Sequence, residues 1–152
     1  MVRRGSENLI RYAKEGDFES IYQLSKKNSD LLGFVMPIEI RQHIRRLECI
    51  VDEDNNFIKG FVLFHLLKNN SYLSIYTICV DENNRGQHIA SNMVNFIQKK
   101  YNRDIRTTCI KDSSSELFWA SIAKKIDESP GKKRPICRYL IRCNRRKLIN
   151  GI

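Results

Sequence analysis

The sequence has no long hydrophobic run. A segment that crosses a bilayer needs roughly 20 consecutive apolar residues, and no stretch of the 152 residues approaches that length. The basic start MVRRGSENLI lacks the apolar centre of a signal peptide. With 41% hydrophobic and 29% charged residues, the composition is typical of a soluble globular protein. We therefore expect a single domain over residues 1–152, located in the cytoplasm and without a membrane partner.

The five cysteines form no CxxC pair, and no His/Cys/Asp spacing is typical of a metal site. Three of them lie within apolar segments that read as strands, where a buried, reduced thiol is the simpler interpretation. No cysteine–histidine pair indicates a nucleophilic thiol. We expect no metal and no redox motif. The three strand cysteines are Cys49, Cys79 and Cys109.

Acidic residues are absent from the last part of the chain. Residues 129–152 contain eight lysines and arginines and no acid, so the remainder of the chain carries only +2 of the formal net charge of +10. Such a basic segment favours a phosphate-rich partner, either a polynucleotide or a phosphorylated cofactor. A solubilising tail is an equally good explanation of the same charges.

Hydrophobic periodicity predicts alternating strands and helices, with no internal repeat and no linker. Apolar alternation indicates strands, and apolar residues three and four apart indicate helices, the second of which has Pro37 in its first turn. The predicted order is β α α β β β α β α β, an α/β fold with a mixed sheet. The predicted strands cover residues 9–12, 48–51, 57–67, 72–80, 105–110 and 136–143, and the helices 16–28, 37–48, 89–101 and 114–126.

The segment VDENNRGQHIA (Val80–Ala90) connects the fourth strand to the third helix. The first amides of a helix have no partners within it, and the helix dipole adds positive potential there, so this turn can hold an anion. Arg85 adds a fixed cation, and Gly86 allows close approach of the backbone to a ligand. A pyrophosphate would fit, although an ordinary strand–turn–helix corner with a surface arginine explains this stretch equally simply.

In its context, this segment resembles the signature R/Q-x-x-G-x-G/A of the GNAT superfamily of acyl-CoA-dependent N-acyltransferases. RGQHIA supplies Arg85 and Ala90 at the two ends, but His88 replaces the central glycine. The resemblance covers about residues 8–139. It implies a GNAT-like fold, with a mixed, mostly antiparallel central sheet flanked by helices, and acetyl-CoA or a related acyl-CoA as cofactor.

The resemblance also implies which residues hold the cofactor. Residues of the signature would line the pyrophosphate, and a bulge would splay the preceding strand so that its backbone pairs with the pantetheine arm. His88 brings a Cβ and a ring where the loop passes closest to the phosphates, so it would shift the loop, lower the affinity for the cofactor or touch a phosphate. A solvent-facing helix histidine is an equally good explanation. The implied cofactor-binding residues are Ile78, Cys79, Val80, Arg85, Gly86, Gln87, His88, Ala90 and Phe118.

The implied chemistry is attack of a neutral amine on a thioester carbonyl, with stabilisation of the oxyanion and protonation of the leaving thiolate. The family often carries N-x-x-A-x-x-F-Y after the fifth strand, and its tyrosine is the usual acid. Here DSSSELFW has Trp119 in that place. Tyr76 is the expected replacement and Tyr139 the second candidate. Asp112 is a candidate base, although it could equally cap the following helix. His43, beside three arginines, is expected on a solvated face.

Two longer segments, LLGFVMPIEIRQHIRRLECIVDEDNNFIKGFVLF and GKKRPICRYLI, are similar to a phage and mobile-element branch of this superfamily that resembles the Mom-type DNA-modification proteins. This narrower resemblance implies an amine on a nucleic-acid-linked acceptor, such as a DNA base or an aminoacyl-tRNA. The alternatives are a catalytically inactive, nucleic-acid-binding protein of GNAT-like fold and an N-acetyltransferase acting on a protein or small-molecule amine. The oligomeric state is left open.

Overall fold

The computed structural model describes residues 9–29, 35–68 and 72–143. Its chain divides into two compact units, which are described separately. The first unit is formed by Met1–His65 and Tyr76–Phe96, and the second by Leu66–Ile75 and Ile97–Ile152. The prediction of a single domain over residues 1–152 stays a prediction. Part of the basic segment, residues 144–152, lies outside the described residues.

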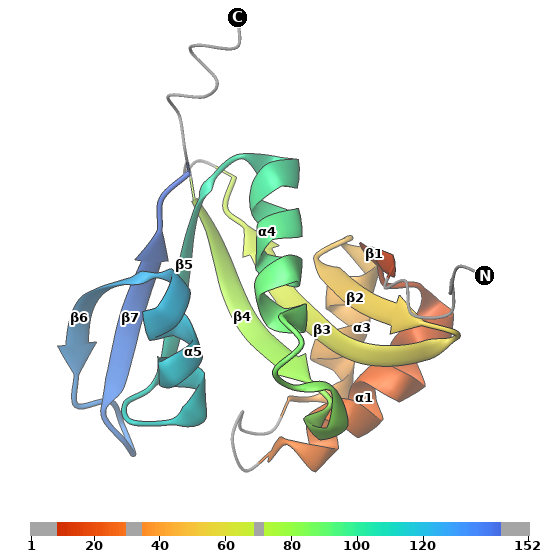
Figure 1. The fold of residues 1–152 in the computed structure, drawn as a ribbon, viewed down its shortest axis with the longest axis horizontal. Coiled ribbons are helices and arrows are strands. Elements are labelled where there is room, and N and C mark those ends of the chain that lie inside the picture. Colours follow the sequence, from red (N-terminus) through yellow and green to blue (C-terminus); the bar gives the residue numbers. More distant parts are fainter. Residues whose placement is uncertain (1–8, 30–34, 69–71, 144–152) are drawn as a thin grey trace, which may run out of the picture. The chain divides into compact units, whose positions relative to one another are not determined.

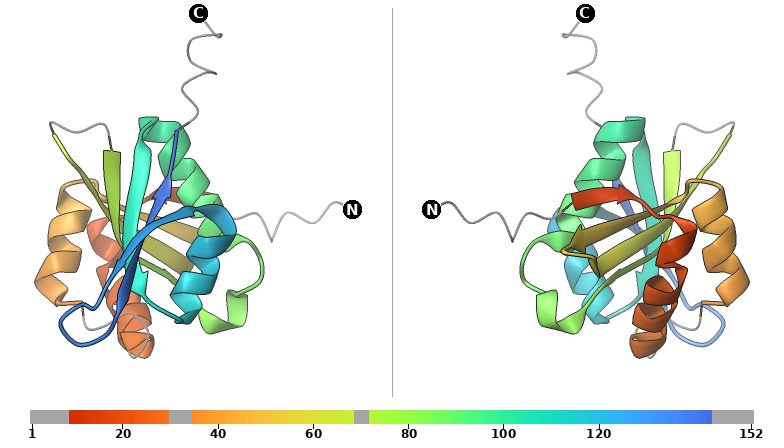
Figure 2. Two further views of the ribbon diagram at one scale, coloured as in Figure 1. Left: turned by 90° about the vertical axis from the view of Figure 1, so that its left-hand side faces the viewer. Right: turned by 90° about the vertical axis from the view of Figure 1, so that its right-hand side faces the viewer.

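The first unit is built around antiparallel strands (Figure 1). Helices α1 and α3 lie on one face of these strands and α4 lies on the other (Figure 2). The unit contains β1 (Leu9–Tyr12), α1 (Phe18–Lys27), α3 (Pro37–Arg45), β2 (Cys49–Asp54), most of β3 (Phe57–Leu66), the second half of β4 (Tyr72–Val80), the first turns of α4 (Ile89–Tyr101), and the short 3-10 helices η1 (Glu15–Asp17) and η2 (Glu82–Asn84).

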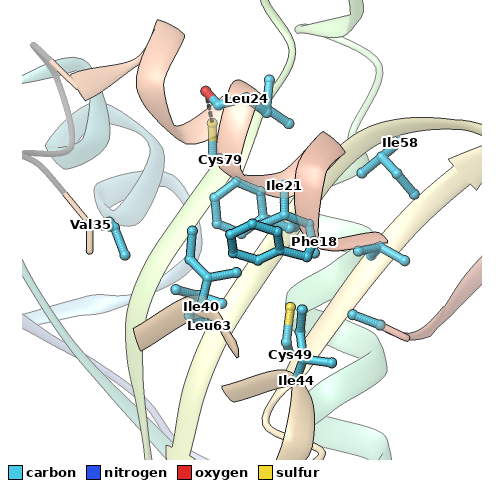
Figure 3. Packing of buried hydrophobic residues seen from close by; sticks show 13 residues of the cluster. Phe18, Ile21, Leu24, Val35, Ile40, Ile44, Cys49, Ile58, Leu63 and Cys79 are labelled. Carbon is cyan, nitrogen blue, oxygen red and sulfur yellow. Dashed lines mark hydrogen bonds between the residues drawn. The ribbon is translucent and has the colours of Figure 1, made fainter. Parts of the chain in front are cut away.

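The core of this unit forms where α1 and α3 pack on the strands (Figure 3). Phe18, Ile21 and Leu24 of α1 are spaced three apart, which places them on one side of the helix. Ile21 and Ile40 are fully buried there. The helical periodicity read from the sequence therefore identifies this packed face correctly.

Strands β2 and β3 form a hairpin whose turn is Asn55–Asn56, with φ angles of 51° and 66°. Two residues with positive φ match a type I′ turn, which fits the twist of the flanking strands, and asparagine tolerates this conformation better than most residues. The two asparagines therefore suit the turn that joins the strands predicted over residues 48–51 and 57–67. Gly60 in β3 is needed because a Cβ there would lie 2.8 Å from the carbonyl oxygen of Cys79 in β4.

The second unit contains the start of β4, the last turn of α4, β5 (Asp104–Ile110), α5 (Ser114–Ile122), β6 (Lys124–Ser129) and β7 (Ile136–Ile141). The first half of β4 pairs in parallel with β5, from Tyr72 opposite Asp104 to Ile75 opposite Thr107. β7 pairs with β5 and with β6, and both pairs are antiparallel. Ser113 caps α5, because its hydroxyl accepts a hydrogen bond from the Glu116 amide at 3.2 Å.

Strand β6 corrects the sequence interpretation, which extended the fourth helix through residue 126 and continued with a turn. The helix ends at Ile122, and Lys124–Ser129 pairs with β7. Nearly all of β6 is exposed, so it has no apolar alternation that could reveal it. The contacts of β6 are made by charged side chains. Arg138 of β7 donates a hydrogen bond to Asp127 at 2.7 Å, and Lys111 donates one to Glu128 at 3.2 Å.

The strands follow the order β1-β2-β3-β4-β5-β7-β6. The pair β4–β5 is parallel, whereas β1–β2, β2–β3, β5–β7 and β6–β7 are antiparallel. Helices flank these strands (Figures 1 and 2). The predicted α/β fold with a mixed, mostly antiparallel sheet is therefore confirmed.

Candidate active site

The loop between β4 and α4 is anchored at its start by Asp81. This residue is 7% exposed, and its carboxylate accepts hydrogen bonds from the Asn83 amide at 3.2 Å and from Nδ2 of Asn84 at 3.0 Å. The Asp81 amide donates to the Lys59 carbonyl of β3 at 2.7 Å. These contacts fix the direction in which the chain leaves β4 before it reaches Arg85.

His88 adopts the backbone conformation that glycine usually provides. Its φ is 62°, and that of Gly86 is 79°, so both residues lie in the left-handed region. For a residue with a Cβ this conformation costs roughly 1–2 kcal/mol. The His88 carbonyl accepts hydrogen bonds from the Asn92 amide at 2.9 Å and from the Ser91 hydroxyl at 3.1 Å, which starts α4. The loop therefore enters the helix through a strained, exposed histidine.

Arg85 ties this loop to the end of α1. Its Nε donates to the Val80 carbonyl at 3.2 Å, and its Nη2 donates to Oδ1 of Asn28 at 2.6 Å. Asn28 in turn donates from Nδ2 to the Leu24 carbonyl at 2.9 Å. Two of the five N–H groups of the guanidinium are used in these contacts. Asn28 escaped the sequence analysis because its partner lies 57 positions away.

The side chains of β4 alternate up to this loop. The buried positions are Leu73, Ile75, Thr77 and Cys79, and the residues between them are half-buried or exposed. The Tyr76 hydroxyl donates to Glu39 of α3 at 3.1 Å, and Sγ of Cys79 lies 3.9 Å from the Leu24 carbonyl of α1. The bulge that the family resemblance implies in this strand stays a prediction.

Cys79 is an inert thiol at this position. It is 4% exposed, and burial raises its pKa to about 12, against a smaller opposing effect of Arg85. The neighbouring residues Ile78 and Val80 are half-buried. Any role of this segment toward a ligand is therefore expected to use its backbone groups rather than the thiol.

Tyr76 forms a polar cluster with two residues of α3. Its side chain is exposed, and its pKa is raised by burial and by the hydrogen bond to Glu39. The ring of His43 stacks on the Tyr76 ring with 5.9 Å between centroids. Nδ1 of His43 lies 2.8 Å from the Glu39 carbonyl oxygen, which can only accept, so Nδ1 carries the proton.

This cluster corrects the interpretation of His43 as a residue on a solvated face, since its side chain is half-buried against Tyr76. Glu39 was missed by the sequence analysis altogether. The spacing of Glu39 and His43, four apart on one helix, was the available signal that both lie on the same face.

The second unit holds the other two catalytic candidates. Tyr139 is 3% exposed, and its hydroxyl donates to Oε2 of Glu116 at 2.6 Å, which raises the pKa of Tyr139 to about 12. Oε1 of Glu116 accepts from the Asp112 amide at 2.8 Å. The hydrogen bond from the Asp112 amide is the main reason why the pKa of Glu116 is lowered to about 2, and the hydrogen bond from Tyr139 is the next largest cause. Tyr139 is thus held as a neutral donor to a carboxylate.

Asp112 itself has an exposed side chain and a φ of 61°. The cap of α5 that the sequence offered as its alternative role belongs to Ser113. Phe118 is half-buried and meets the buried Trp119 edge to face, with 4.9 Å between ring centroids. Asp112, Phe118 and Tyr139 lie in the second unit, whereas Tyr76 and the residues of the loop lie in the first.

Within the described ranges, no group of three or more histidine, cysteine, aspartate or glutamate side chains could hold a metal ion. All five cysteines are free thiols, and four of them are buried. No helix among the described residues is long and apolar enough to cross a membrane.

Comparison with solved structures finds the same fold in N-acetyltransferases. Ard1 from Thermoplasma volcanium is 16% identical, with a TM-score of 0.78 over 90% of this chain and 98% of its own. An N-acetyltransferase from Staphylococcus aureus is 18% identical, with a TM-score of 0.72 over 90% and 99% of the two chains. N-acetylglutamate synthase from Neisseria gonorrhoeae, in complex with coenzyme A and N-acetyl-glutamate, is 16% identical, with a TM-score of 0.73 over 90% of this chain and 36% of its own.

No protein-family model and no curated protein sequence matches this chain. Identities of 16–18% carry information about the fold only. The strand order and the left-handed loop before α4 accompany these similarities. The chain has the fold of the GNAT N-acetyltransferases.

Proposed function

We propose that this protein is an acyl-CoA-dependent N-acyltransferase that transfers an acetyl or related acyl group to an amine. The observation that carries the proposal is the loop from Val80 to Ala90, in which Gly86 and His88 are both left-handed directly before α4. Left-handed residues allow successive backbone amides to converge on one anion, and the start of a helix favours an anion as well. Acetyl-CoA, whose pyrophosphate is such an anion, is the proposed cofactor.

Residues of the loop would hold the pyrophosphate. The amides at the start of α4 have no partners within the helix and can donate to phosphate oxygens. Arg85 contributes positive charge from a position fixed by Val80 and Asn28. Ala90 is small and leaves the first turn uncrowded. We assign the pyrophosphate to Arg85, Gly86, Gln87, His88 and Ala90.

The end of β4 is the proposed place for the pantetheine arm. The bulge that the family resemblance implies would leave ladder groups of this strand unpaired, so that the backbone of Ile78, Cys79 and Val80 would pair with the amides of that arm. The amide of Cys79 or Val80 is the proposed donor to the oxyanion. Phe118 is proposed as an apolar contact for the cofactor. When bound, the cofactor supplies a thioester whose carbonyl carbon is the electrophile.

Three side chains are proposed for proton transfer. Tyr76 is the first candidate for the acid that protonates the leaving thiolate, because it is exposed on the strand that leads to the loop. Tyr139 is the second candidate, but it is buried and held by Glu116. Asp112 is the candidate base from the second unit, with an exposed carboxylate.

We further propose that the acceptor amine is attached to nucleic acid, either a DNA base or an aminoacyl-tRNA, as in the Mom-like branch of the superfamily. The support is the basic segment 129–152, in which Lys132, Lys133 and Arg134 are exposed. The competing function is nucleic-acid binding without catalysis. It is favoured by the replacement of the signature glycine by His88 and of the usual tyrosine by Trp119.

Calorimetric titration with acetyl-CoA tests the cofactor. We expect micromolar binding that is lost in Arg85→Glu, because the substitution places an anion beside the pyrophosphate and breaks the contact with Asn28. Lys99→Glu, at the other end of α4, makes the same change of charge away from the loop and is the matched control. Normal binding by Arg85→Glu would show that the pyrophosphate lies elsewhere.

Titration with double-stranded DNA and with tRNA at several salt concentrations separates the two functions. A nucleic-acid-modifying enzyme binds both acetyl-CoA and polynucleotide, the latter with strong salt dependence. A binding protein without catalysis binds only polynucleotide. An acyltransferase acting on proteins or small molecules binds only acetyl-CoA.

A further inference from the structure

The polar cluster of Tyr76, Glu39 and His43 presents an acceptor atom to solvent. A carboxylate can only accept hydrogen bonds, so the proton of this pair sits on the Tyr76 hydroxyl, which donates to Oε2 of Glu39. The lone pairs of the Tyr76 oxygen then remain available. Tyr76 is 54% exposed, so a ligand can reach that oxygen. The pair therefore offers an incoming donor an oxygen that is backed by a negative charge.

The side chains of the cluster favour a compact cation beside an aromatic ring. Glu39 and His43 are four apart, which places them along one face of α3. The ring of His43 packs on Tyr76 with Nδ1 bound to a backbone carbonyl, so the aromatic side of the cluster is held in place.

We propose that Glu39, acting through Tyr76 and in place of Asp112, is the base that removes a proton from an acceptor bound as a protonated primary alkylamine. Of the two nucleic-acid-linked acceptors proposed above, an aminoacyl-tRNA carries such an amine and a DNA base does not. This assignment rests on the proposed acyltransferase function and names the acceptor chemistry of the same site. The amine is the class of substrate that the pair fits, because an ammonium group donates hydrogen bonds and carries the charge opposite to Glu39.

The proton moves in one relay. An N–H bond of the ammonium breaks and its proton forms a bond to the Tyr76 oxygen, while the original phenolic proton passes to Oε2 of Glu39. The products are a neutral amine, a neutral tyrosine and a protonated Glu39, so no charge is created or lost. The freed nitrogen lone pair can then attack the thioester carbonyl carbon. Tyr76 is still protonated at that stage and stays competent as the acid for the thiolate.

Glu39 also lies in the first turn of α3, where a carboxylate is stabilised by the helix dipole. A purely structural role would therefore predict a change in thermal stability and no change in how the reaction rate depends on pH. The two roles differ in the reaction of a charged amine, because only the relay needs Glu39 as the final proton acceptor.

The test measures thiol release from acetyl-CoA by the full chain with two nucleophiles. Propylamine is protonated at neutral pH, whereas hydroxylamine is mostly uncharged there and needs no base. With propylamine we expect Glu39→Gln to be slower by roughly 10²–10⁴-fold, the usual contribution of general base catalysis. Its rate should rise about tenfold per pH unit toward the pKa of the amine. With hydroxylamine we expect Glu39→Gln to stay within a few-fold of the natural protein.

Tyr76→Phe keeps the ring that stacks on His43 and removes only the hydroxyl. If both residues act in one relay, Tyr76→Phe should lose as much activity toward propylamine as Glu39→Gln, and the double variant should lose little more. Glu19→Gln is the control for the loss of a charge, since the Glu19 carboxylate accepts from Gln23 on the exposed side of α1. It should transfer acetyl groups to propylamine as the natural protein does.

Acetyl-CoA binding, measured by calorimetry, separates this inference from the proposed function. We expect Glu39→Gln to bind acetyl-CoA normally. Equal rates for Glu39→Gln and Glu19→Gln with propylamine would overturn the relay, and so would a natural protein that binds acetyl-CoA but never uses propylamine. A natural protein that does not bind acetyl-CoA would instead overturn the proposed function.

Discussion

A buried carboxylate limits the stability of the first unit. Asp52 of β2 is fully buried, and neither of its carboxylate oxygens has a hydrogen-bond partner among residues 9–29, 35–68 and 72–143. It pairs across the hairpin with Gly60, whose missing Cβ would face Met93 and Ile89 of α4. Paired residues project to the same face, so Asp52 lies on the side of the strands that α4 covers. We predict that Asp52→Val stabilises the protein.

The expected gain follows from the desolvation of the group. A buried polar group without a partner costs about 1–3 kcal/mol, and replacing it by an apolar group of similar shape removes that cost. Valine also favours a strand. In a chain of this size, each kcal/mol raises the melting temperature by about 2–4 °C. We therefore expect Asp52→Val to unfold at a clearly higher temperature than the natural protein at neutral pH.

The pH dependence provides a second measurement of the same effect. Burial raises the pKa of Asp52, opposed by the charge of Lys59 and reinforced by that of Asp54. Because the folded protein holds this proton more tightly than the unfolded chain, its stability falls as pH rises from the ordinary pKa of aspartate, about 3.9, to the folded pKa. The advantage of Asp52→Val should grow over the same range and then stay constant.

Denaturant unfolding from pH 4 to 8 measures this difference, with Thr108→Val at an exposed position of β5 as the control for a new valine in a strand. The control should change the free energy of unfolding by less than about 0.5 kcal/mol, as expected for surface substitutions. If Asp52→Val were less stable than the natural protein at pH 7, the carboxylate would be stabilised by its surroundings. That result would refute the reasoning from its missing partners.

Two further substitutions test the geometry of the loop and its supporting strand. For His88→Gly we expect a melting temperature above that of His88→Val, because glycine adopts a φ of 62° without a steric cost. Acetyl-CoA binding by His88→Gly, measured by calorimetry, should be unchanged or tighter. Equal stability of the two variants would contradict a strained His88. For Gly60→Ala we expect the free energy of unfolding, measured with denaturant, to fall by about 1–3 kcal/mol, because the new Cβ would lie 2.8 Å from the Cys79 carbonyl oxygen. Gly16→Ala is the control, because its new Cβ would have nothing within 4 Å and its stability should change little.

Much of the fold was predictable because its elements bury one face. The spacing of Phe18, Ile21 and Leu24 predicts α1, and Pro37 marks the start of α3. Strand β6 was not predictable in this way. It is exposed on both faces and is kept in the sheet by its backbone ladder to β7 and by ion pairs such as Asp127 with Arg138. Hydrophobic periodicity arises because one face of an element is buried. An edge strand without a buried face therefore shows no alternation of apolar and polar residues.

The candidate site was predictable where it is local and hidden where it depends on distant contacts. Arg85 and Gly86 were identified because they follow one another in a single turn. Glu39 meets Tyr76 across 37 positions, and Asn28 meets Arg85 across 57. The sequence around one member of each pair contains no pattern that identifies the other member. The residues that hold Tyr76 and Arg85 in place therefore required the packing of α1 and α3 on the strands.

His88 shows why residue type is a weak guide to the conformation of a loop. A histidine at the signature glycine brings a Cβ to a position where the family has none, and a shifted loop was one expectation from the sequence. The φ of His88 is 62°, in the left-handed region that glycine adopts freely and that costs a residue with a Cβ about 1–2 kcal/mol. Asp81 holds the chain before His88, and Asn92 and Ser91 donate to the His88 carbonyl after it. Backbone strain that is retained at one residue is frequent in functional loops. The departure from the signature at His88 therefore lies in the side chain rather than in the backbone conformation.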